Sequence, residues 1–481
     1  MSREALAARL SAILGEDFVF TTGLASFASD ATLARGFSAQ PWAAVMPANS
    51  QEVAEVVALC YELGVPIVPR GGGTGLAGGA VPVQGGVVVA LDRMRAVRYF
   101  APEHWHIEVE AGLPTAQLQR RARESGLFFP PDSGAAEQSQ IGGNVATNAG
   151  GPQAFKYGAT RRWVSGVEVV VAPGRIVQLG SLLRKDVTGY DLTGLLVGSE
   201  GTLGLITAAS LRLLPAPELR LPLVACFASL PAGCAAVESV LSSGLQPAAL
   251  DYAEGLSIEV SRGGFPGDLP QQTRFVVLAE VDGAEAEAMS LRAELTELFD
   301  SDALAVFAPL EPGEASAIWR WREGISHAVR AHAGGKVTED VTVPANHFLT
   351  AVRGTVEIGA RHGLAACSWG HAGDGNLHST FMVAREPQAL AVAERAAEEV
   401  CHMALALGGS LTGEHGIGSL KGRHVPLQLD PGALELQRAV KHAFDPNGLF
   451  NPGTKLPESE PDLEAESELQ RHERGAIDAS S

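Results

Sequence analysis

The sequence has few cysteines for its 481 residues, and none of them has the spacing that a cysteine-based site requires. The five cysteines are scattered, odd in number and never arranged as CxxC. This pattern predicts neither a disulfide framework nor an iron–sulfur cluster. It fits a protein of the reducing cytoplasm.

The sequence also lacks an excess of basic residues and lacks long apolar runs. The formal net charge of −19 opposes binding to nucleic acid or to an anionic membrane. No window approaches the roughly 18 apolar residues that span a bilayer. Arg3, Glu4 and Arg9 interrupt the first predicted helix, which is untypical of a signal peptide. We expect a cytoplasmic protein that reaches a membrane only through a partner.

Glycine, in contrast, is abundant, and Pro69–Ala80 holds six glycines in twelve positions. This loop follows a β-α-β pattern, with strands at Ala43–Met46 and Val65–Val68 and a helix that we expect Ser50 to cap. Backbone N–H groups in such a loop can approach and bind a phosphate. A plain turn is the alternative, although a turn needs only one or two glycines.

Gly73, Gly75 and Gly78 match the GxGxxG fingerprint of dinucleotide binding. That fingerprint binds a pyrophosphate when the loop opens a helix. Here the strand-like run Val87–Leu91 follows the loop, after a proline and two further glycines. The context disfavours an NAD-binding Rossmann domain and favours a phosphate-bearing cofactor in a helix-free loop.

Two more glycine-rich segments follow in the first half of the chain. Pro130–Gly151 is almost empty of large apolar side chains, and we expect a functional loop there. Lys185–Ile206 is again dense in glycine and ends in a predicted strand at Leu203–Thr207. Between them, Ser165–Ala172 is predicted to be a buried strand.

The glycine loop, the PPD and IGGN motifs of Pro130–Gly151 and the run VGSEGTLGLIT at Val197–Thr207 resemble, in order and spacing, the FAD domain of the vanillyl-alcohol oxidase superfamily. Within it, the chain resembles the glycolate, D-lactate and D-2-hydroxyglutarate dehydrogenases from about Trp42 to Leu456. The resemblance implies an α+β protein in which a PCMH-type FAD-binding domain precedes a ferredoxin-like cap that binds the substrate.

The expected division of the chain follows from the resemblance and from composition. Past Pro215–Pro217 glycine thins out, and strands near Leu221–Phe227 and Arg274–Val281 alternate with alanine-rich helices such as Ala284–Leu298. The acidic end of the chain is poor in apolar residues and is expected to be disordered. The expected parts are an N-terminal helix and lead-in at 1–36, the FAD-binding domain at 37–215, the substrate domain at 216–456 and the tail at 457–481.

The resemblance also implies which residues bind FAD. The loop Arg70–Leu76 would hold the pyrophosphate, and the NPG turn at Asn451 would lie near the flavin ring. No histidine occurs within Pro69–Ala80, so we expect the FAD to be non-covalent. The implied set is Arg70, Gly71, Gly72, Gly73, Thr74, Gly75, Leu76, Pro131, Asp132, Gly142, Gly143, Asn144, Glu200, Gly201, Ile206 and Asn451.

Two histidines of the second half flank a predicted turn, at His371 and His378 in SWGHAGDGNLHSTF. Two strands joined by that turn can point both imidazoles into one space. Hydrogen-bonded structural histidines are the alternative. With Glu414 of the later TGEHGIG motif, they supply two nitrogens and one carboxylate, the composition of an open catalytic metal site. The resemblance implies zinc or manganese at these three residues.

The resemblance assigns Arg322 and Lys336 to the substrate carboxylate, a task that suits the planar fork of arginine. The metal would acidify the hydroxyl of a 2-hydroxy acid, and His415 would take its proton as general base. Hydride transfer to the flavin N5 would then give the 2-oxo acid. Gly413 before the glutamate, and Thr380, resemble the glycolate and D-lactate members more than the D-2-hydroxyglutarate members.

Several interpretations stay open at this point. The electron acceptor could be a quinone, an electron-transfer flavoprotein, an iron–sulfur partner subunit or oxygen, and a homodimer is compatible with the sequence. An oxygen-using alcohol oxidase of the same fold is one alternative function. A non-catalytic flavoprotein subunit is another, although it would not need the histidines and Glu414.

Overall fold

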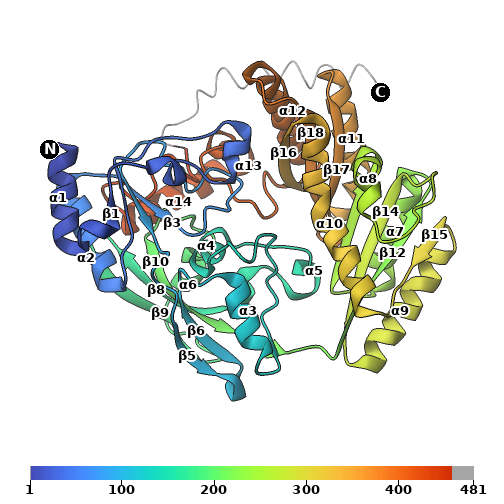
Figure 1. Ribbon diagram of the computed structural model, residues 1–481, viewed down its shortest axis with the longest axis horizontal. Helices are drawn as coiled ribbons and strands as arrows, with labels where there is room; N and C mark the ends of the chain where they lie inside the picture. Colours follow the sequence, from blue (N-terminus) through green and yellow to red (C-terminus); the bar gives the residue numbers. More distant parts are fainter. Residues whose placement is uncertain (1, 458–481) are drawn as a thin grey trace.

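The computed structural model of the protein describes residues 2–457 and shows two lobes side by side (Figure 1). Residues 458–481, which make up nearly all of the predicted tail, lie outside the described residues. Within residues 2–457, no helix is long and apolar enough to cross a membrane.

The first lobe begins with a four-stranded sheet in the order β1-β2-β4-β3. Both β2 and β3 run parallel to β4, whose residues are all buried, and α2 connects β2 to β3. The predicted β-α-β unit is confirmed, except that Asn49 rather than Ser50 caps α2 through its side chain. The elements are α1 (Arg3–Leu14), β1 (Val19–Phe20), β2 (Ala43–Val45), α2 (Ser50–Leu63), β3 (Ile67–Arg70) and β4 (Val87–Ala90).

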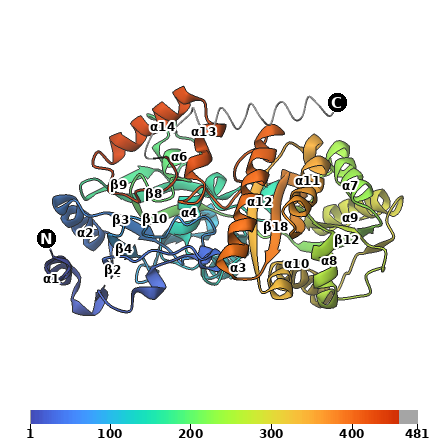
Figure 2. The same ribbon diagram turned by 90° about the horizontal axis from the view of Figure 1, so that it is seen from above.

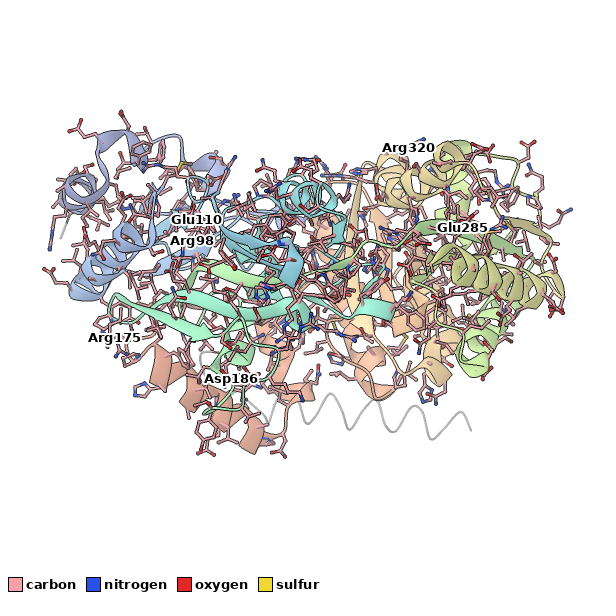
Figure 3. All side chains as sticks on the ribbon, turned by 90° about the horizontal axis from the view of Figure 1, so that it is seen from below. Arg98, Glu110, Arg175, Asp186, Glu285 and Arg320 are labelled. Atoms are coloured by element: carbon pink, nitrogen blue, oxygen red, sulfur yellow. The ribbon has the colours of Figure 1, made fainter. Side chains whose placement is uncertain are left out.

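A five-stranded antiparallel sheet in the order β5-β6-β10-β8-β9 completes the first lobe. On one face, Arg98 of β5 lies beside Glu110 of β6 (Figure 3), with Nε 3.5 Å from Oε1. The strands are β5 (Val97–Ala101), β6 (His106–Glu110), β8 (Val164–Val171), β9 (Arg175–Gly180) and β10 (Leu205–Arg212). The helices are α3 (Thr115–Arg123), α4 (Ile141–Thr147), α5 (Ala154–Tyr157) and α6 (Leu192–Leu196).

One sequence-based expectation needs correction in this lobe. The segment Pro130–Gly151 is not a loop throughout, because its IGGN motif begins the helix α4, which interrupts it. Ile141 and Val145 lie one helical turn apart and are buried in the lobe's core, which anchors that short helix.

The second lobe is built on a seven-stranded antiparallel sheet in the order β15-β12-β14-β13-β17-β18-β16. Along β14, Val277 and Ala279 join a core under α7, α9, α11 and α12, while Val276 and Leu278 join a second core under α8 and α10. This alternation, typical of a strand covered on both faces, explains its continuous apolar sequence. The strands are β12 (Leu219–Phe227), β13 (Ala249–Glu254), β14 (Phe275–Gly283), β15 (Ala305–Phe307), β16 (Gly335–Thr342), β17 (Ala365–His371) and β18 (Asn376–Val383).

The helices of the second lobe alternate with these strands. They are α7 (Leu230–Ser243), α8 (Gly255–Ser261), α9 (Glu285–Asp300), α10 (Pro312–Ala333), α11 (Phe348–Arg361) and α12 (Pro387–Ala406). The lobes are joined after β11 (Leu214–Pro215), which pairs with β7 (Leu127–Phe128) of the first lobe.

The end of the described chain returns to the first lobe. Figures 1 and 2 place α14 (Pro431–Phe444), which follows the short α13 (Val425–Gln428), against that lobe. Phe450 is fully buried in its core, and the backbone N–H of Asn451 donates to the carbonyl of Ile67. In space, therefore, the last part of the range 216–456 lies with the FAD-binding half and not with the seven-stranded sheet.

Candidate active site

The predicted histidine pair lies on one β-hairpin of the second lobe. His371 ends β17 and pairs with Asn376, while His378 of β18 pairs with Trp369. Because directly paired residues share a face of the sheet and side chains alternate along each strand, both imidazoles point to the same side. The sequence-based prediction of two strands around a turn is confirmed.

Glu414 reaches these histidines from a loop of the same lobe. Its Oε1 lies 3.3 Å from Nε2 of His371 and 3.2 Å from Nε2 of His378, and the three side chains are only 18%, 7% and 12% exposed. Their donor atoms lie within 4.8 Å of one another. Two nitrogens and a carboxylate oxygen at this spacing fit a divalent ion with an open coordination position.

The second nitrogen of His371 is held by a buried carboxylate. Nδ1 of His371 lies 2.7 Å from Oδ1 of Asp251, and Oδ2 of Asp251 lies 2.7 Å from Arg322. An Nδ1–H that donates to Asp251 leaves the Nε2 lone pair directed at Glu414. Two electron-rich atoms face each other at 3.3 Å only with a proton or a cation between them, so Nε2 of His371 can share either a proton or a metal ion with Glu414.

The electrostatics of the two histidines differ. Burial opposes a charge on His371, but Asp251 and Glu414 outweigh it and raise its pKa to about 10. Burial lowers the pKa of His378 to about 4, and the neighbouring His415 acts in the same direction. His378 is therefore neutral at neutral pH, the state in which imidazole binds a metal.

Asp340 of β16 organises the loop that carries Glu414. Its Oδ2 accepts hydrogen bonds from the backbone N–H groups of Gly413, Glu414 and His415 at 2.9 to 3.0 Å, and from the Thr412 hydroxyl at 2.7 Å. Burial opposes the charge, yet the surrounding cations hold the pKa of this carboxyl far below its ordinary value. Asp340 thus fixes the backbone from which both Glu414 and His415 project.

His415 lies at the edge of the three proposed ligands. Its ring stacks on that of His378, with 5.1 Å between centroids and 21° between planes. It is more exposed than His371, since it lies in the intermediate range of exposure. The structure thus brings together the four residues predicted for metal binding and proton transfer.

The two cations predicted to hold the substrate carboxylate reach this cluster through intervening residues: Arg322 contacts Asp251, which holds His371, and Lys336 lies over Trp369, the strand partner of His378. Nε of Arg322 is buried and has no hydrogen-bond partner among residues 2–457. Nζ of Lys336 donates to the Ser326 hydroxyl at 2.7 Å and lies over the Trp369 ring. Burial lowers the pKa of Lys336 to about 8. An anion near Lys336 would favour its charged form.

The predicted FAD loop packs closely against the segment Gln138–Gly143, which includes the start of the IGGN motif. A Cβ on Gly72 would lie 1.9 Å from the Gln138 carbonyl, and one on Gly71 would lie 3.5 Å from Gly143. Gly73 has a positive φ of 68°, and the space above Gly143 is open. Glycine is thus required where the loop meets the neighbouring backbone.

Other predicted FAD residues surround this loop. Asp132 follows the paired β7 strand and is half-buried, and loss of solvent around it raises its pKa to about 6. The Asn144 side chain donates to Thr115, whereas Oε1 of Gln140 is buried without a partner among the described residues. Ile206 of β10 lies in the core of the first lobe.

Glu200 connects the two halves of the candidate site. Its carboxylate accepts from the backbone N–H of Gly418 at 2.6 Å and of Ile417 at 3.1 Å, on the loop that carries Glu414. Nδ2 of Asn451 donates to the Glu200 carbonyl, and its Oδ1 is buried and unpartnered within residues 2–457. The carboxylate of Glu200 thus binds protein backbone in addition to any role near the cofactor.

Sequence reasoning missed Asp251 and Asp340, which hold the predicted ligands in place. Neither lies within a glycine motif, and each comes from a strand distant in sequence from the residue that it positions. The only signal in the sequence was an aspartate inside a strand of mainly apolar residues. Because an acidic residue is rarely buried without a partner, such a position indicates a carboxylate that binds another side chain.

Comparison with known proteins identifies the family of the chain. The description "FAD linked oxidases, C-terminal domain" matches residues 216–454, and "FAD binding domain" matches residues 41–180. The glycolate oxidase subunit GlcD of Bacillus subtilis is 36% identical over 87% of this chain and 89% of its own length. The chain belongs to the FAD-linked oxidase family.

Members of this family carry FAD, and the residues present fit that cofactor. The glycines Gly71–Gly73 of the loop have no side chains that would block a phosphate, and the buried oxygens Oε1 of Gln140 and Oδ1 of Asn451 have no partner among the described residues.

Two further comparisons support the family and the fold. A D-lactate dehydrogenase of Anaerostipes hadrus is 33% identical over 86% of this chain and 89% of its own. The solved structure of p-cresol methylhydroxylase with substrate bound superimposes with a TM-score of 0.78 at 20% identity, covering 94% of this chain and 96% of the other. The protein is an FAD-linked oxidoreductase with the fold of the vanillyl-alcohol oxidase superfamily.

Proposed function

We propose that this FAD-linked oxidase is a dehydrogenase that oxidises a small 2-hydroxy acid, glycolate or D-lactate, to the 2-oxo acid. The observation that carries the proposal is the convergence of His371, His378 and Glu414, with His415 stacked beside them. The relatives that are named as a glycolate oxidase subunit and a D-lactate dehydrogenase support the substrate class.

In this proposal, Arg322 and Lys336 hold the substrate carboxylate. The free Nε–H of Arg322 and the ammonium of Lys336 supply hydrogen bonds from two elements, α10 and β16. Fixing the carboxylate orients the α-carbon and its hydroxyl, which removes orientational entropy from the reaction. The closeness of Arg322 to Asp251 also couples substrate binding to the position of His371.

His415 accepts the proton of the substrate hydroxyl. His371, His378 and Glu414 would hold a zinc or manganese ion, and Asp251 would keep His371 in the tautomer that binds through Nε2. When bound, the ion lowers the pKa of a hydroxyl and FAD accepts a hydride. Asp340 holds the backbone of Glu414 and His415, so that ligand and base keep a fixed distance.

The electrons that leave the substrate must pass to an acceptor. We propose a protein partner or a quinone, because the glycine loop lacks the helix that a nicotinamide fingerprint requires. The name of the Bacillus subtilis relative as a subunit supports assembly with partner subunits.

Anaerobic mixing of the FAD-loaded protein with D- and L-2-hydroxy acids tests the function. Glycolate or D-lactate should bleach the flavin absorbance near-stoichiometrically, whereas the L-isomers should not. Preference for D-2-hydroxyglutarate would reassign the substrate, and no bleaching by any 2-hydroxy acid would overturn the proposal. Rapid reoxidation by air would favour an oxygen-using oxidase instead.

Two perturbations separate the metal from the base. Exhaustive chelation should abolish bleaching while the flavin absorbance remains, and added zinc or manganese should restore it. His415→Ala should slow flavin reduction by about 100- to 10,000-fold, the usual contribution of a general base, with FAD and metal still bound. The exposed His442→Ala of α14 is the matched control and should leave the rate unchanged.

A further inference from the structure

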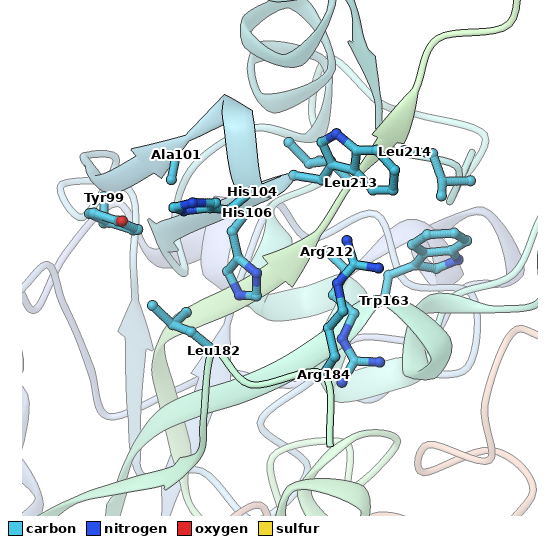
Figure 4. A pocket seen from close by; sticks show the side chains of 11 residues that line it. Tyr99, Ala101, His104, His106, Trp163, Leu182, Arg184, Arg212, Leu213 and Leu214 are labelled. Carbon is cyan, nitrogen blue, oxygen red and sulfur yellow. The ribbon is translucent and has the colours of Figure 1, made fainter. Parts of the chain in front are cut away.

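A second cavity, here called the outer pocket, opens in the first lobe and shares no lining residue with the candidate active site (Figure 4). Its volume is about 390 Å³, within the range of small-molecule sites. The lining comes from β5, the β5–β6 turn, the loop after β9, β10 and β11. We propose that the outer pocket binds a planar aromatic ring that bears a phosphate or a carboxylate.

The charge of the outer pocket requires an anion. Arg184 and Arg212 reach the same part of the cavity (Figure 4), and neither side chain has a hydrogen bond or an ion pair with another of residues 2–457. Burial lowers the pKa of His106, and the charges of Arg212 and Arg184 act in the same direction. No aspartate or glutamate lies among the lining residues of the outer pocket, so neither guanidinium is neutralised there. Their mutual repulsion is relieved when an anion binds between them.

The walls of the outer pocket select a ring. Trp105, Tyr99 and Trp163 line it, and the Arg184 guanidinium lies 5.1 Å from the centre of the Trp105 ring. Trp105 has a φ of +58°, a left-handed conformation that is costly for a bulky residue and is found mostly where structure serves function. It remains 36% exposed despite its size. An aromatic ligand would cover these faces by stacking.

The two recognition elements define the ligand class together. A bare anion would leave the exposed parts of the Tyr99 and Trp105 rings in water, and a neutral ring would leave the two arginines without an anion. An arginine fork binds a carboxylate or a phosphate through two hydrogen bonds, so both anions fit the charge. The shared chemistry is therefore an aromatic monoanion or dianion of about the size of a phenyl phosphate or a mononucleotide.

Quenching of tryptophan fluorescence tests the proposal on the protein saturated with FAD. Phenyl phosphate, benzoate and AMP are titrated beside inorganic phosphate and phenol, which each carry half of the recognition. An aromatic anion should bind at least about tenfold more tightly than either half, the worth of one charge-assisted hydrogen bond. Tighter binding of phenyl phosphate or AMP identifies a phosphate ligand, and tighter binding of benzoate a carboxylate. Quenching that is seen only in the FAD-free protein would show binding in the cofactor site, and it would overturn the proposal, as would equal affinity for phenyl phosphate, inorganic phosphate and phenol.

Variants locate the binding. Arg212→Ala and Arg184→Ala should each weaken the aromatic anion by about 10- to 100-fold, and Trp105→Phe should remove part of the quenching signal. Arg175→Ala, on the exposed edge strand β9 (Figure 3), is the matched control and should bind normally. Unchanged affinity in both arginine variants, or an effect of equal size in the control, would contradict a site in the outer pocket.

Discussion

Asp340 shows how one residue can control a site that it does not enter. It is 1% exposed, and four donors of the segment Thr412–His415 converge on its Oδ2. An asparagine amide would turn either its N–H groups, which cannot accept, or its weaker oxygen acceptor toward those four donors. Asp340→Asn should therefore loosen the segment Thr412–His415. Loss of such a positioning contact typically costs about 10- to 100-fold in metal affinity.

Metal titration of the FAD-loaded protein, followed by the metal content of each sample, checks this prediction. The affinity of Asp340→Asn for zinc or manganese should fall while its flavin absorbance stays intact, which separates a positioning effect from unfolding. The exposed Asp268→Asn serves as control. Full metal affinity in Asp340→Asn would show that the loop keeps its shape without the carboxylate.

The buried carboxyl of Glu254 leads to a second prediction at the scale of one residue. Burial raises its pKa from 4.5 to about 7, although the Ser368 N–H donates to its Oε1. Because the folded-state pKa is raised, the stabilisation from its proton is complete below pH about 4.5 and is lost as the pH rises through about 7. The shift corresponds to about 3 kcal/mol of unfolding free energy.

Glu254→Gln keeps an oxygen for the Ser368 N–H and removes the titration. The variant should therefore gain stability relative to the parent protein between pH 5 and 8, as read from denaturant midpoints at each pH. Glu259→Gln, at an exposed position of the helix α8 that Glu254 precedes, should follow the parent at every pH. A constant difference between Glu254→Gln and the parent across this range would contradict a raised pKa.

At the scale of elements, the glycine loop after β3 depends on contacts that a side chain would prevent. Gly72→Ala would place a methyl group 1.9 Å from the Gln138 carbonyl, which must then move. We expect this variant to lose most of its FAD, as measured by the ratio of flavin to protein absorbance. Gly134→Ala lies in the same region with open space at its Cβ, and it should keep its FAD.

Local patterns predicted the elements of the candidate site, and they did not predict the residues that support it. The hairpin around His371 and His378 follows from alternating strands and a turn, and the structure confirms it. The helix α4 was missed because glycines in IGGN conceal a helix whose stability comes from the buried Ile141 and Val145. Asp251 and Asp340 act across strands that pair only in the folded sheet, so no sequence window contains them with their partners.

At the scale of the whole molecule, the candidate site requires two lobes in a fixed arrangement. Oδ1 of Asp282 on β14 lies 2.5 Å from Lys156, and its Oδ2 accepts from the Tyr157 hydroxyl at 2.6 Å, both on α5 of the first lobe. Glu200 makes the corresponding link from the first lobe to Gly418. These contacts keep the FAD-binding loop opposite the histidine hairpin.

Asp282→Ala tests whether this link matters. The Asp282 carboxylate is fully buried, whereas Lys156 is 28% exposed. Breaking a fully buried ion pair costs about 3–5 kcal/mol of unfolding free energy. Because one partner here is partly exposed, we expect a smaller loss of about 2 kcal/mol. Arg361→Ala removes an ion pair whose partners are 58% and 42% exposed, and it should cost less than about 1 kcal/mol of unfolding free energy.

Thermal unfolding, followed by both flavin release and circular dichroism, compares the two variants. Flavin release from Asp282→Ala should precede the loss of secondary structure, because the lobes separate before either sheet unfolds. Coincident transitions in both variants would mean that the lobes are held together by their apolar contacts alone.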